Sequence, residues 1–176
     1  MQSFSVVLPC FNEEQVIAST IQDVASWFQL QGIEGDIVAV DDGSKDGMPA
    51  LLDALAAKMD CLTVIHHDHN RGYGSAIRTG CDAATKEIIG FMDSDGQFPA
   101  SEFSKFLPYF ATVDMVSGIR VKRADPLMRI VNSKVYRFFI NVLFGICVVD
   151  LECGMKAFRK DVWPLIRPQY ATGAFF

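Results

Sequence analysis

Two carboxylates stand two residues apart in the segment GFMDSDGQF, which covers Gly90–Phe98. Asp93 and Asp95 would repel each other there unless a proton or a cation neutralises them. A divalent ion that prefers oxygen ligands, Mg²⁺ or Mn²⁺, suits such a pair and keeps open positions for phosphate oxygens. The alternative is a polar turn before Phe98 that binds nothing. The elements that carry the two residues decide between a metal site and a turn.

Two further acidic segments follow apolar runs, PCFNEE at 9–14 and VDDGSKDG at 40–47. Around them, short β-rich runs alternate with helical patterns. The sequence predicts strands at 3–9, 36–42, 61–67 and 87–93, and helices at 16–31, 44–59, 72–85 and 100–110. This alternation is typical of right-handed βαβ units. We therefore expect an α/β, Rossmann-like fold with a mainly parallel central sheet and helices on both faces.

The acidic segments follow three of the predicted strands, those at 3–9, 36–42 and 87–93. The carboxyl ends of parallel strands meet at one edge of a sheet, and this is where ligands of open α/β proteins bind. Chance is a poor explanation for three acidic segments at one edge. The pattern favours the metal site.

Composition limits the other possibilities. A chain of 176 residues, half of them hydrophobic, is long enough to bury one core and too short for two ordinary domains, so we expect a single domain over 1–176. A net charge of -5 argues against a nucleic-acid partner. The five cysteines form no C-x-x-C pair, which fits a reducing, cytoplasmic setting. The longest apolar run, 138–149, is shorter than the roughly 20 residues that cross a bilayer.

Five segments share their order and spacing with a known family. They are PCFNEE, VDDGSKDG, NRGYGSAIRTG, MDSDGQ and DLECGMKAFRKDV. The chain resembles the family 2 inverting glycosyltransferases with the GT-A fold, and most of all the polyprenyl-phosphate sugar transferases of the dolichyl-phosphate mannose synthase type. Five segments in register are far more specific than one D-x-D. The resemblance implies a nucleotide-sugar-binding half at 1–98 and an acceptor-side half at 99–176, which we expect to be truncated because relatives continue further.

The resemblance also implies roles on the donor side, with a UDP- or GDP-hexose as donor. Asp93 and Asp95 match the family's D-x-D, which binds the metal that bridges the donor diphosphate, and Gln97 matches a further ligand. The nucleotide-binding residues that it implies are Pro9, Phe11, Asn12, Glu13, Asp41, Asp42, Asn70, Gly72 and Ser94. Asn12 and Ser44 also suit helix caps, and the two roles are compatible.

Basic residues dominate 118–137, although the chain as a whole is acidic. The resemblance assigns Arg120, Arg129 and Ser133 to the phosphate of a lipid acceptor, and it adds Arg120 to the catalytic residues. The planar fork of arginine suits phosphate because it binds two oxygens at once. Basic and bulky apolar residues alternate at 126–149, which predicts either a helix in the membrane interface or an ordinary core helix.

The chemistry of the acceptor decides whether a general base is needed. A phosphate acceptor is already ionised near neutral pH, whereas a hydroxyl needs a base, for which Asp150 or Glu152 is the candidate. Lys156 and Arg159 either neutralise the donor diphosphate or lie at a strand edge. The histidines of HHDHN, at 66–70, match no usual zinc spacing, and we leave them out of the site.

We therefore expect metal-dependent, inverting transfer of a hexose from a nucleoside diphosphate to dolichyl or undecaprenyl phosphate. The inner face of the membrane is the expected location. One alternative is transfer to a saccharide hydroxyl in polysaccharide or cell-envelope synthesis. Another is a protein that binds nucleotide sugars without turnover, because a fold does not fix a function.

Overall fold

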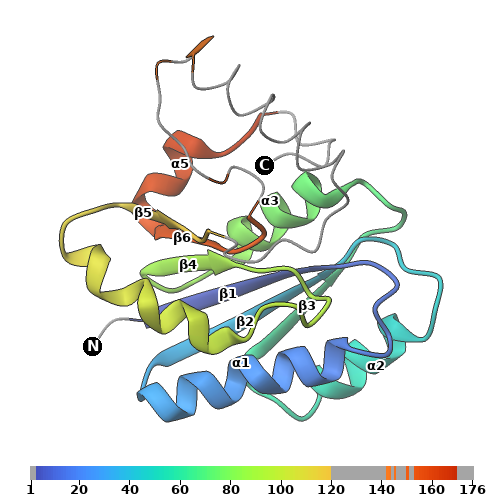
Figure 1. The fold of residues 1–176 in the computed structure, drawn as a ribbon. Helices are drawn as coiled ribbons and strands as arrows, with labels where there is room; N and C mark the ends of the chain where they lie inside the picture. The colour runs from blue at the N-terminus through green and yellow to red at the C-terminus, as the bar shows by residue number, and fades with distance from the viewer. Residues whose placement is uncertain (1–2, 120–141, 144, 146–149, 151–152, 170–176) are drawn as a thin grey trace, which may run out of the picture.

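The computed structural model describes residues 3–119, 142–143, 145, 150 and 153–169. Its strands are β1 (Ser3–Cys10), β2 (Glu34–Asp41), β3 (Leu62–His66), β4 (Ile88–Phe91), β5 (Met115–Ser117) and β6 (Lys156–Arg159). In the described residues they form one sheet of order β3-β2-β1-β4-β6-β5 (Figure 1). The strands β1 to β4 run parallel to one another, and β6 pairs antiparallel with β4 and β5. The predicted mainly parallel sheet is confirmed.

Helices cover both faces of this sheet, as predicted (Figure 1). One face carries α1 (Ile17–Gln31), α2 (Met48–Ala56) and two 3₁₀ helices, η1 (Ala100–Lys105) and η2 (Leu107–Ala111). The other face carries α3 (Tyr73–Ala83), together with α5 (Trp163–Ile166), which follows the short η3 (Lys160–Val162).

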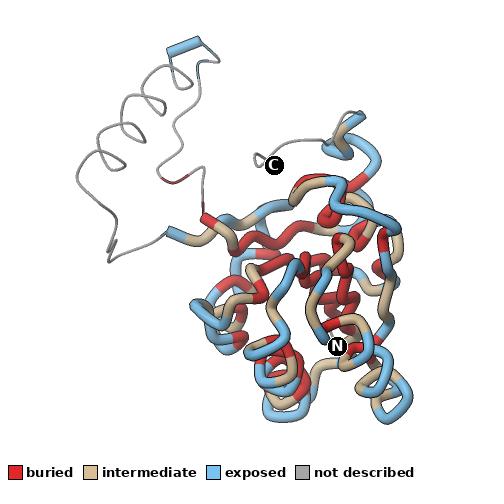
Figure 2. The backbone as a smooth tube through the Cα atoms, turned by 90° about the vertical axis from the view of Figure 1, so that its right-hand side faces the viewer, coloured by how far each residue is buried: buried red, intermediate tan, exposed pale blue. Residues whose placement is uncertain are grey.

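The central strand β1 is buried from Phe4 to Cys10, because helices pack on both of its faces (Figure 2). Phe4 contacts Trp27 of α1 and Phe103 of η1, with ring centroids 5.2 and 5.0 Å apart. The Trp27 indole N–H also donates to the Ser104 hydroxyl at 2.8 Å. These contacts fix α1 and η1 against the strands that carry the acidic loops.

The ends of the helices match the sequence in part. α1 ends where predicted, at Gly32, whose φ of 62° is in the left-handed region that glycine favours. The first turns of α1 and α2 have no side-chain cap, so the cap roles predicted for Asn12 and Ser44 are wrong. The predicted helix at 100–110 is two 3₁₀ segments. Pro108 has no N–H to donate to an α-helical bond, which breaks the pattern there.

Candidate active site

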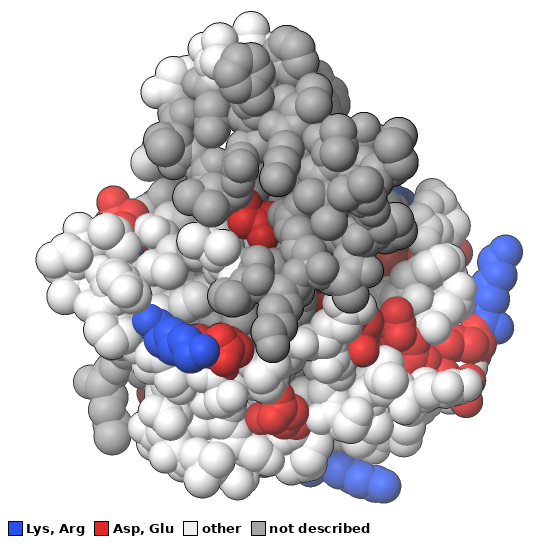
Figure 3. All heavy atoms as spheres, in the orientation of Figure 1, with Lys and Arg blue, Asp and Glu red and all other residues white. Residues whose placement is uncertain are grey.

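The loops that follow β1, β2 and β4 lie at one edge of the sheet. Strand β1 pairs in parallel with both other strands, with Cys10 opposite Asp41 and Val7 opposite Phe91. The three acidic segments therefore meet there, as predicted. Figure 3 shows acidic side chains gathered at this edge, on the right of the view.

Hydrogen bonds join the loop after β1 to the loop after β2. The backbone N–H of Asn12 donates to the Ser44 hydroxyl, and the Asn12 side-chain oxygen accepts from the Lys45 N–H, both at 2.9 Å. Glu14 accepts from the Gly47 N–H, also at 2.9 Å. Asn12 has a φ of 56°, a left-handed conformation that asparagine tolerates better than most residues. Asn12 and Ser44 therefore fix the two loops to each other.

Asp41 is a buried carboxylate at the end of β2. Its Oδ1 accepts the Ser44 N–H at 2.9 Å, and its Oδ2 lies 2.8 Å from Nδ1 of His66. The other ring nitrogen of His66 lies 3.1 Å from the carboxylate of Asp53, on α2. Burial acts to raise the pKa of Asp41, but the hydrogen bonds from Ser44 and His66 outweigh it and lower that pKa. The same bond to Asp41 raises the pKa of His66. The arrangement favours an ionised Asp41.

Asp42 is also buried, and its carboxylate accepts three hydrogen bonds. Nδ1 of His67 lies 2.7 Å from its Oδ1, which also accepts the Arg71 N–H at 2.9 Å. Its Oδ2 accepts the Gly72 N–H at 2.8 Å. The far ring nitrogen of His67 lies 3.0 Å from the Thr79 hydroxyl, on α3. Asp42 thus holds the turn before α3 against the end of β2.

His66 and His67, which the sequence analysis leaves out of the site, each lie within hydrogen-bond distance of a predicted donor-binding carboxylate. Two consecutive histidines end the strand predicted at 61–67, and two consecutive aspartates end the strand predicted at 36–42. That pairing was a usable signal. The spacing of HHDHN was compared only with zinc sites, whereas histidine also forms hydrogen bonds with carboxylates.

A pocket of about 640 Å³ opens beside these residues. Phe11, Asp41 and Asn70, all predicted to bind the nucleotide, line it together with Ser44 and His66. Its volume lies within the range of small-molecule sites, roughly 300–1,000 Å³. The pocket therefore has room for a nucleoside.

Asp93 follows β4 and is held from two sides. Its Oδ1 accepts the Tyr73 hydroxyl, from the first turn of α3, at 2.7 Å. On the other side lies the backbone of Gly154, where an added β-carbon would lie 1.9 Å from Oδ2. The structure thus brings together the MDSDGQ and CGMK segments, which lie far apart in the sequence.

The rest of the loop after β4 is ordered by its own hydrogen bonds. Asp95 accepts the Gln97 N–H at 2.9 Å, and the Gln97 side chain is exposed. Ser94 is buried and donates to the Pro9 carbonyl at 2.9 Å, while its own carbonyl accepts the Thr20 hydroxyl at 3.1 Å. Ser94 therefore links this loop to the ends of β1 and α1.

The negative charges of this edge act on their neighbours. Burial, followed by the charges of Asp95 and Asp46, raises the pKa of Glu13. Burial, followed by the charge of Asp93, raises the pKa of the Tyr73 hydroxyl far above its usual value. The loops after β1, β2 and β4 thus share one negative field, to which a cation would be attracted.

The donor atoms suit a metal that is shared with a substrate. Within residues 3–119, 142–143, 145, 150 and 153–169, no three His, Cys, Asp or Glu side chains are arranged to hold a metal by themselves. Mg²⁺ typically binds one or two carboxylates and takes its remaining oxygens from water and substrate phosphates. Asp93 and Asp95, two residues apart on one loop, fit that kind of coordination.

The matching family model decides the family. The model described as glycosyl transferase family 2 matches residues 5–164. The chain belongs to glycosyl transferase family 2. The match covers all the donor-side residues predicted above, and it confirms the family resemblance of the five segments.

Curated relatives of this family 2 chain include two bacterial proteins named undecaprenyl-phosphate 4-deoxy-4-formamido-L-arabinose transferase. The protein of Pectobacterium carotovorum subsp. carotovorum (strain PC1) is 29% identical over 164 residues, which are 92% of this chain and 50% of the relative. The protein of Pseudomonas paraeruginosa (strain DSM 24068 / PA7) is 30% identical over 161 residues, 90% and 47% of the two chains. The chain thus spans about half the length of these curated relatives.

Solved structures of glycosyltransferases share the fold. A mannosyltransferase from Pyrobaculum calidifontis, in complex with GDP-Man and Mn²⁺, has a TM-score of 0.67 at 23% identity, covering 94% of this chain and 46% of its own. Glucosyl-3-phosphoglycerate synthase from Mycobacterium tuberculosis, with Mn²⁺, UDP and phosphoglyceric acid, has a TM-score of 0.69 at 20% identity, covering 92% and 57%. At these identities the likeness concerns the fold, and it confirms the predicted GT-A architecture.

The predicted acceptor-side residues of this family 2 chain, Arg120, Arg129 and Ser133, lie outside the described residues. So does most of 126–149, in which Val142 and Leu143 are described and exposed. Across the described ranges, no helix is both long and apolar enough to cross a bilayer. Membrane contact through 126–149 stays a prediction.

The residues near the end of the chain separate into two groups. Asp150, the candidate base, is buried, and Glu152 lies outside the described residues. Lys156 is opposite Phe91 at the carboxyl end of β4, where its ammonium donates to the Cys153 carbonyl at 2.9 Å. Arg159 lies at the other end of β6, opposite the first residue of β4. Lys156 is thus on the acidic side of the sheet, whereas Arg159 has the alternative role at a strand edge.

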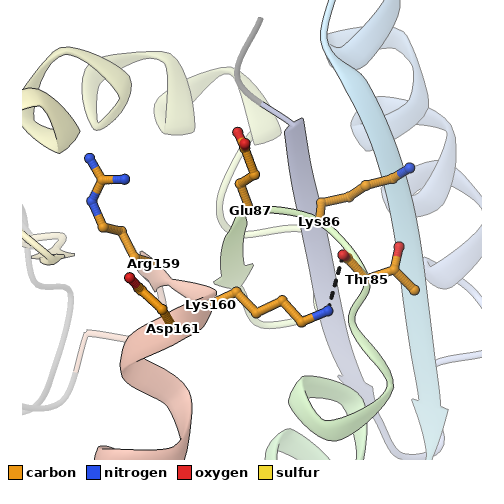
Figure 4. A pocket seen from close by; sticks show the side chains of 6 residues that line it. All are labelled: Thr85, Lys86, Glu87, Arg159, Lys160 and Asp161. Carbon is orange, nitrogen blue, oxygen red and sulfur yellow. Dashed lines mark hydrogen bonds between the residues drawn. The ribbon is translucent and has the colours of Figure 1, made fainter.

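A second pocket lies near Arg159, at the edge opposite the acidic loops (Figure 4). Its charged side chains are of both signs, and several already have partners. The Lys160 ammonium donates to the Thr85 carbonyl at 3.1 Å, and Lys86 pairs with Glu34 at 2.6 Å. Of the residues considered for the donor or the acceptor, Arg159 lines it, at the end of β6 that is away from the acidic loops. This pocket is separate from the candidate active site.

Proposed function

We propose that this family 2 chain transfers a hexose from a UDP- or GDP-sugar to a polyprenyl phosphate, with a divalent metal at Asp93 and Asp95. One observation carries the proposal. A pocket with room for a nucleoside, next to Asp41, lies at the same sheet edge as the Asp93–Asp95 loop. A nucleoside diphosphate has two parts that match these two features: a base with its ribose, which would fill the pocket, and a charged diphosphate, which would lie beside the Asp93–Asp95 loop.

Different residues of the described part of the chain would contact the nucleoside and the diphosphate of the donor. Phe11, Asp41 and Asn70 would contact the nucleoside, and a carboxylate suits a ribose diol because it only accepts hydrogen bonds. Asp93 and Asp95 would hold Mg²⁺ or Mn²⁺ beside the diphosphate, with Gln97 as a further ligand. When bound, such a metal supplies Lewis-acid stabilisation of the leaving diphosphate.

The acceptor is proposed from chemistry and from the relatives. Their names pair undecaprenyl phosphate with a modified L-arabinose. An ionised phosphate oxygen attacks the anomeric carbon without a general base, in line with the departing diphosphate and with inversion. Arg120, Arg129 and Ser133 would hold that phosphate at the inner face of the membrane. Residues 1–98 would form the donor half, and 99–176 part of the acceptor side.

The test is a transfer assay with labelled UDP- and GDP-sugars and vesicles that contain undecaprenyl or dolichyl phosphate. We expect label to move into the lipid fraction, to stop with EDTA, and to stop in Asp95→Asn. In Arg129→Ala, we expect transfer to fall while metal-dependent hydrolysis of the donor continues. Label on a saccharide hydroxyl, with none in the lipid fraction, would mean that the acceptor is a saccharide and not a lipid phosphate. Nucleotide binding without turnover would mean that the chain is a nucleotide-sugar-binding protein and not an enzyme.

A further inference from the structure

The two histidines at the end of β3 lie on opposite faces of the sheet. Consecutive residues of an extended strand project to opposite faces. His66 therefore reaches Asp53 on α2, and His67 reaches Thr79 on α3, helices that cover opposite faces. The other ring nitrogen of each lies against a carboxylate at the end of the neighbouring strand β2, Asp41 or Asp42. Each histidine thus bridges a carboxylate and a helix.

We propose that His66 and His67 are positioning residues of the donor site, each of which fixes one carboxylate that shapes the nucleoside pocket. The proposal rests on the proposed function, because it concerns the same pocket. It adds two residues to those that the five family segments provide, since only the NRGYG segment that follows them was assigned to the site.

His67 is the stronger case because both partners of the pair are enclosed. The side chains of His67 and Asp42 are 3% and 5% exposed. A carboxylate that leaves water is costly unless donors surround it. Because a carboxylate only accepts, His67 must donate through Nδ1, and in the neutral ring Nε2 then accepts from Thr79. The Asp42 carboxylate therefore fixes the tautomer, and the Thr79 hydroxyl on the other side fixes the angle of the ring.

The position of Asp42 in turn determines a wall of the pocket. Its two oxygens accept the N–H groups of Arg71 and Gly72, so they hold the turn that enters α3. Asn70, which lines the pocket, precedes that turn and accepts the Gly72 N–H at 3.1 Å. Without His67, Asp42 would lose its side-chain donor, and we expect its carboxylate to turn toward water. The 70–72 segment would then lose the hydrogen bonds from Arg71 and Gly72 to Asp42.

His66 acts on the other carboxylate, Asp41. It lines the cavity itself and is 35% exposed, whereas Asp41 is 3% exposed. With the Ser44 N–H on Oδ1 and His66 on Oδ2, the Asp41 carboxylate has a single orientation. Asp53, whose side chain is 69% exposed, is a weaker partner of the other ring nitrogen, at 3.1 Å.

The experiment compares three substitutions of His67 by nucleotide titration with Mn²⁺ present and by amide hydrogen exchange of the free chain. Asn places an amide near Nδ1 and keeps the bond to Asp42, whereas Gln reaches only the Nε2 position and Leu removes both. The matched control is Leu62→Ala, a buried change at the other end of β3 that loosens the strand without touching Asp42.

We expect His67→Leu and His67→Gln to weaken UDP or GDP binding by about tenfold or more, the scale of one lost charge-assisted hydrogen bond. Exchange at Arg71 and Gly72 should rise in the same two variants. His67→Asn and Leu62→Ala should stay close to the wild type in both measurements. Wild-type exchange at Arg71 and Gly72 in folded His67→Leu would overturn the inference alone. A wild-type chain that binds neither nucleotide would overturn the proposed function, and the donor role of the histidines with it.

Discussion

The backbone of Gly154 lies against the carboxylate of Asp93, so that a β-carbon on residue 154 would lie 1.9 Å from Oδ2. Tyr73 holds the opposite oxygen of Asp93 at 2.7 Å. The neighbours of the glycine, Cys153 and Met155, are buried in the core, so the backbone there has little freedom to retreat. Asp93 is therefore fixed between a hydroxyl and a stretch of main chain.

Gly154→Ala should displace Asp93 and reduce sugar transfer. A shift of about 1 Å in a group that binds the reacting diphosphate costs on the order of a hundredfold in rate. Initial rates of donor hydrolysis and lipid transfer measure the effect. The control is Gly32→Ala at the far end of α1, which should cost about 1–2 kcal/mol of stability because its φ is 62°, with normal rates. Equal rates in the two alanine variants would contradict the role given to Gly154.

Tyr73→Phe removes the hydroxyl that donates to Asp93 and leaves the ring in place. We expect the apparent affinity for Mn²⁺ to fall by about 10–100-fold, as is usual when a partner of a metal-binding carboxylate is lost. Rates at saturating Mn²⁺ should recover most of the loss. A Mn²⁺ titration of donor hydrolysis provides the comparison, and an unchanged half-saturation point would show that Tyr73 does not support metal binding.

Stability should depend on pH through the pair of His66 and Asp41. The hydrogen bond that His66 donates to Asp41 raises the pKa of His66, so the contribution of His66 to stability is complete below about pH 6.5 and is lost as the pH rises through the folded value. The pKa of Asp41 is lowered, so its contribution exists above about pH 3.9 and is lost as the pH falls through the folded value. The charged pair is therefore most stabilising between these limits.

The matched variant is His66→Asn, which keeps a donor near Asp41 and removes the charge. We expect the difference in free energy of unfolding between wild type and variant to be largest near pH 5–6 and to shrink toward pH 9. Urea unfolding across this range measures it. A difference that stays constant with pH would mean that the ring is not charged in the folded chain.

Ser94→Ala tests a structural role for a residue that was predicted to bind nucleotide. The change leaves the buried Pro9 carbonyl without its side-chain donor, and we expect a loss of about 1–3 kcal/mol in the free energy of unfolding. Ser26→Ala, on the exposed side of α1, should change stability by less than about 0.5 kcal/mol. Urea titrations measure the free energy of unfolding of both variants. An unchanged free energy of unfolding in Ser94→Ala would mean that the hydroxyl contributes nothing to holding the loop.

The sequence was most informative where periodicity and strand order act together. Alternating strands and helices predicted a parallel sheet, and the parallel register of β1 with β2 and β4 then brought Asp41 and the Asp93–Asp95 loop to one edge. Gly32 predicted the end of α1 because few other residues favour its left-handed conformation. These features depend on local sequence patterns and on one topological rule, that the carboxyl ends of parallel strands meet at the same edge of a sheet.

Features that depend on tertiary contacts were missed. Asn12 and Ser44 are residue types that often cap helices, but here they form hydrogen bonds between the loop after β1 and the loop after β2. No local sequence pattern reveals such bonds. The contact of Gly154 with Asp93 joins segments about sixty residues apart, and spacing alone does not indicate it. His66 was missed because its partner Asp41 lies on a neighbouring strand.

Metal-dependent nucleotide binding is the central claim, and thermal unfolding with UDP or GDP, in Mn²⁺ or in EDTA, tests it most directly. At about 100 times its dissociation constant, the right nucleotide should raise the midpoint by roughly 5–10 °C for a chain of this size. We expect such a shift for one nucleotide in Mn²⁺, and its loss in EDTA and in Asp95→Asn. No shift with either nucleotide, or an equal shift in EDTA, would contradict a metal-assisted donor site at Asp93 and Asp95.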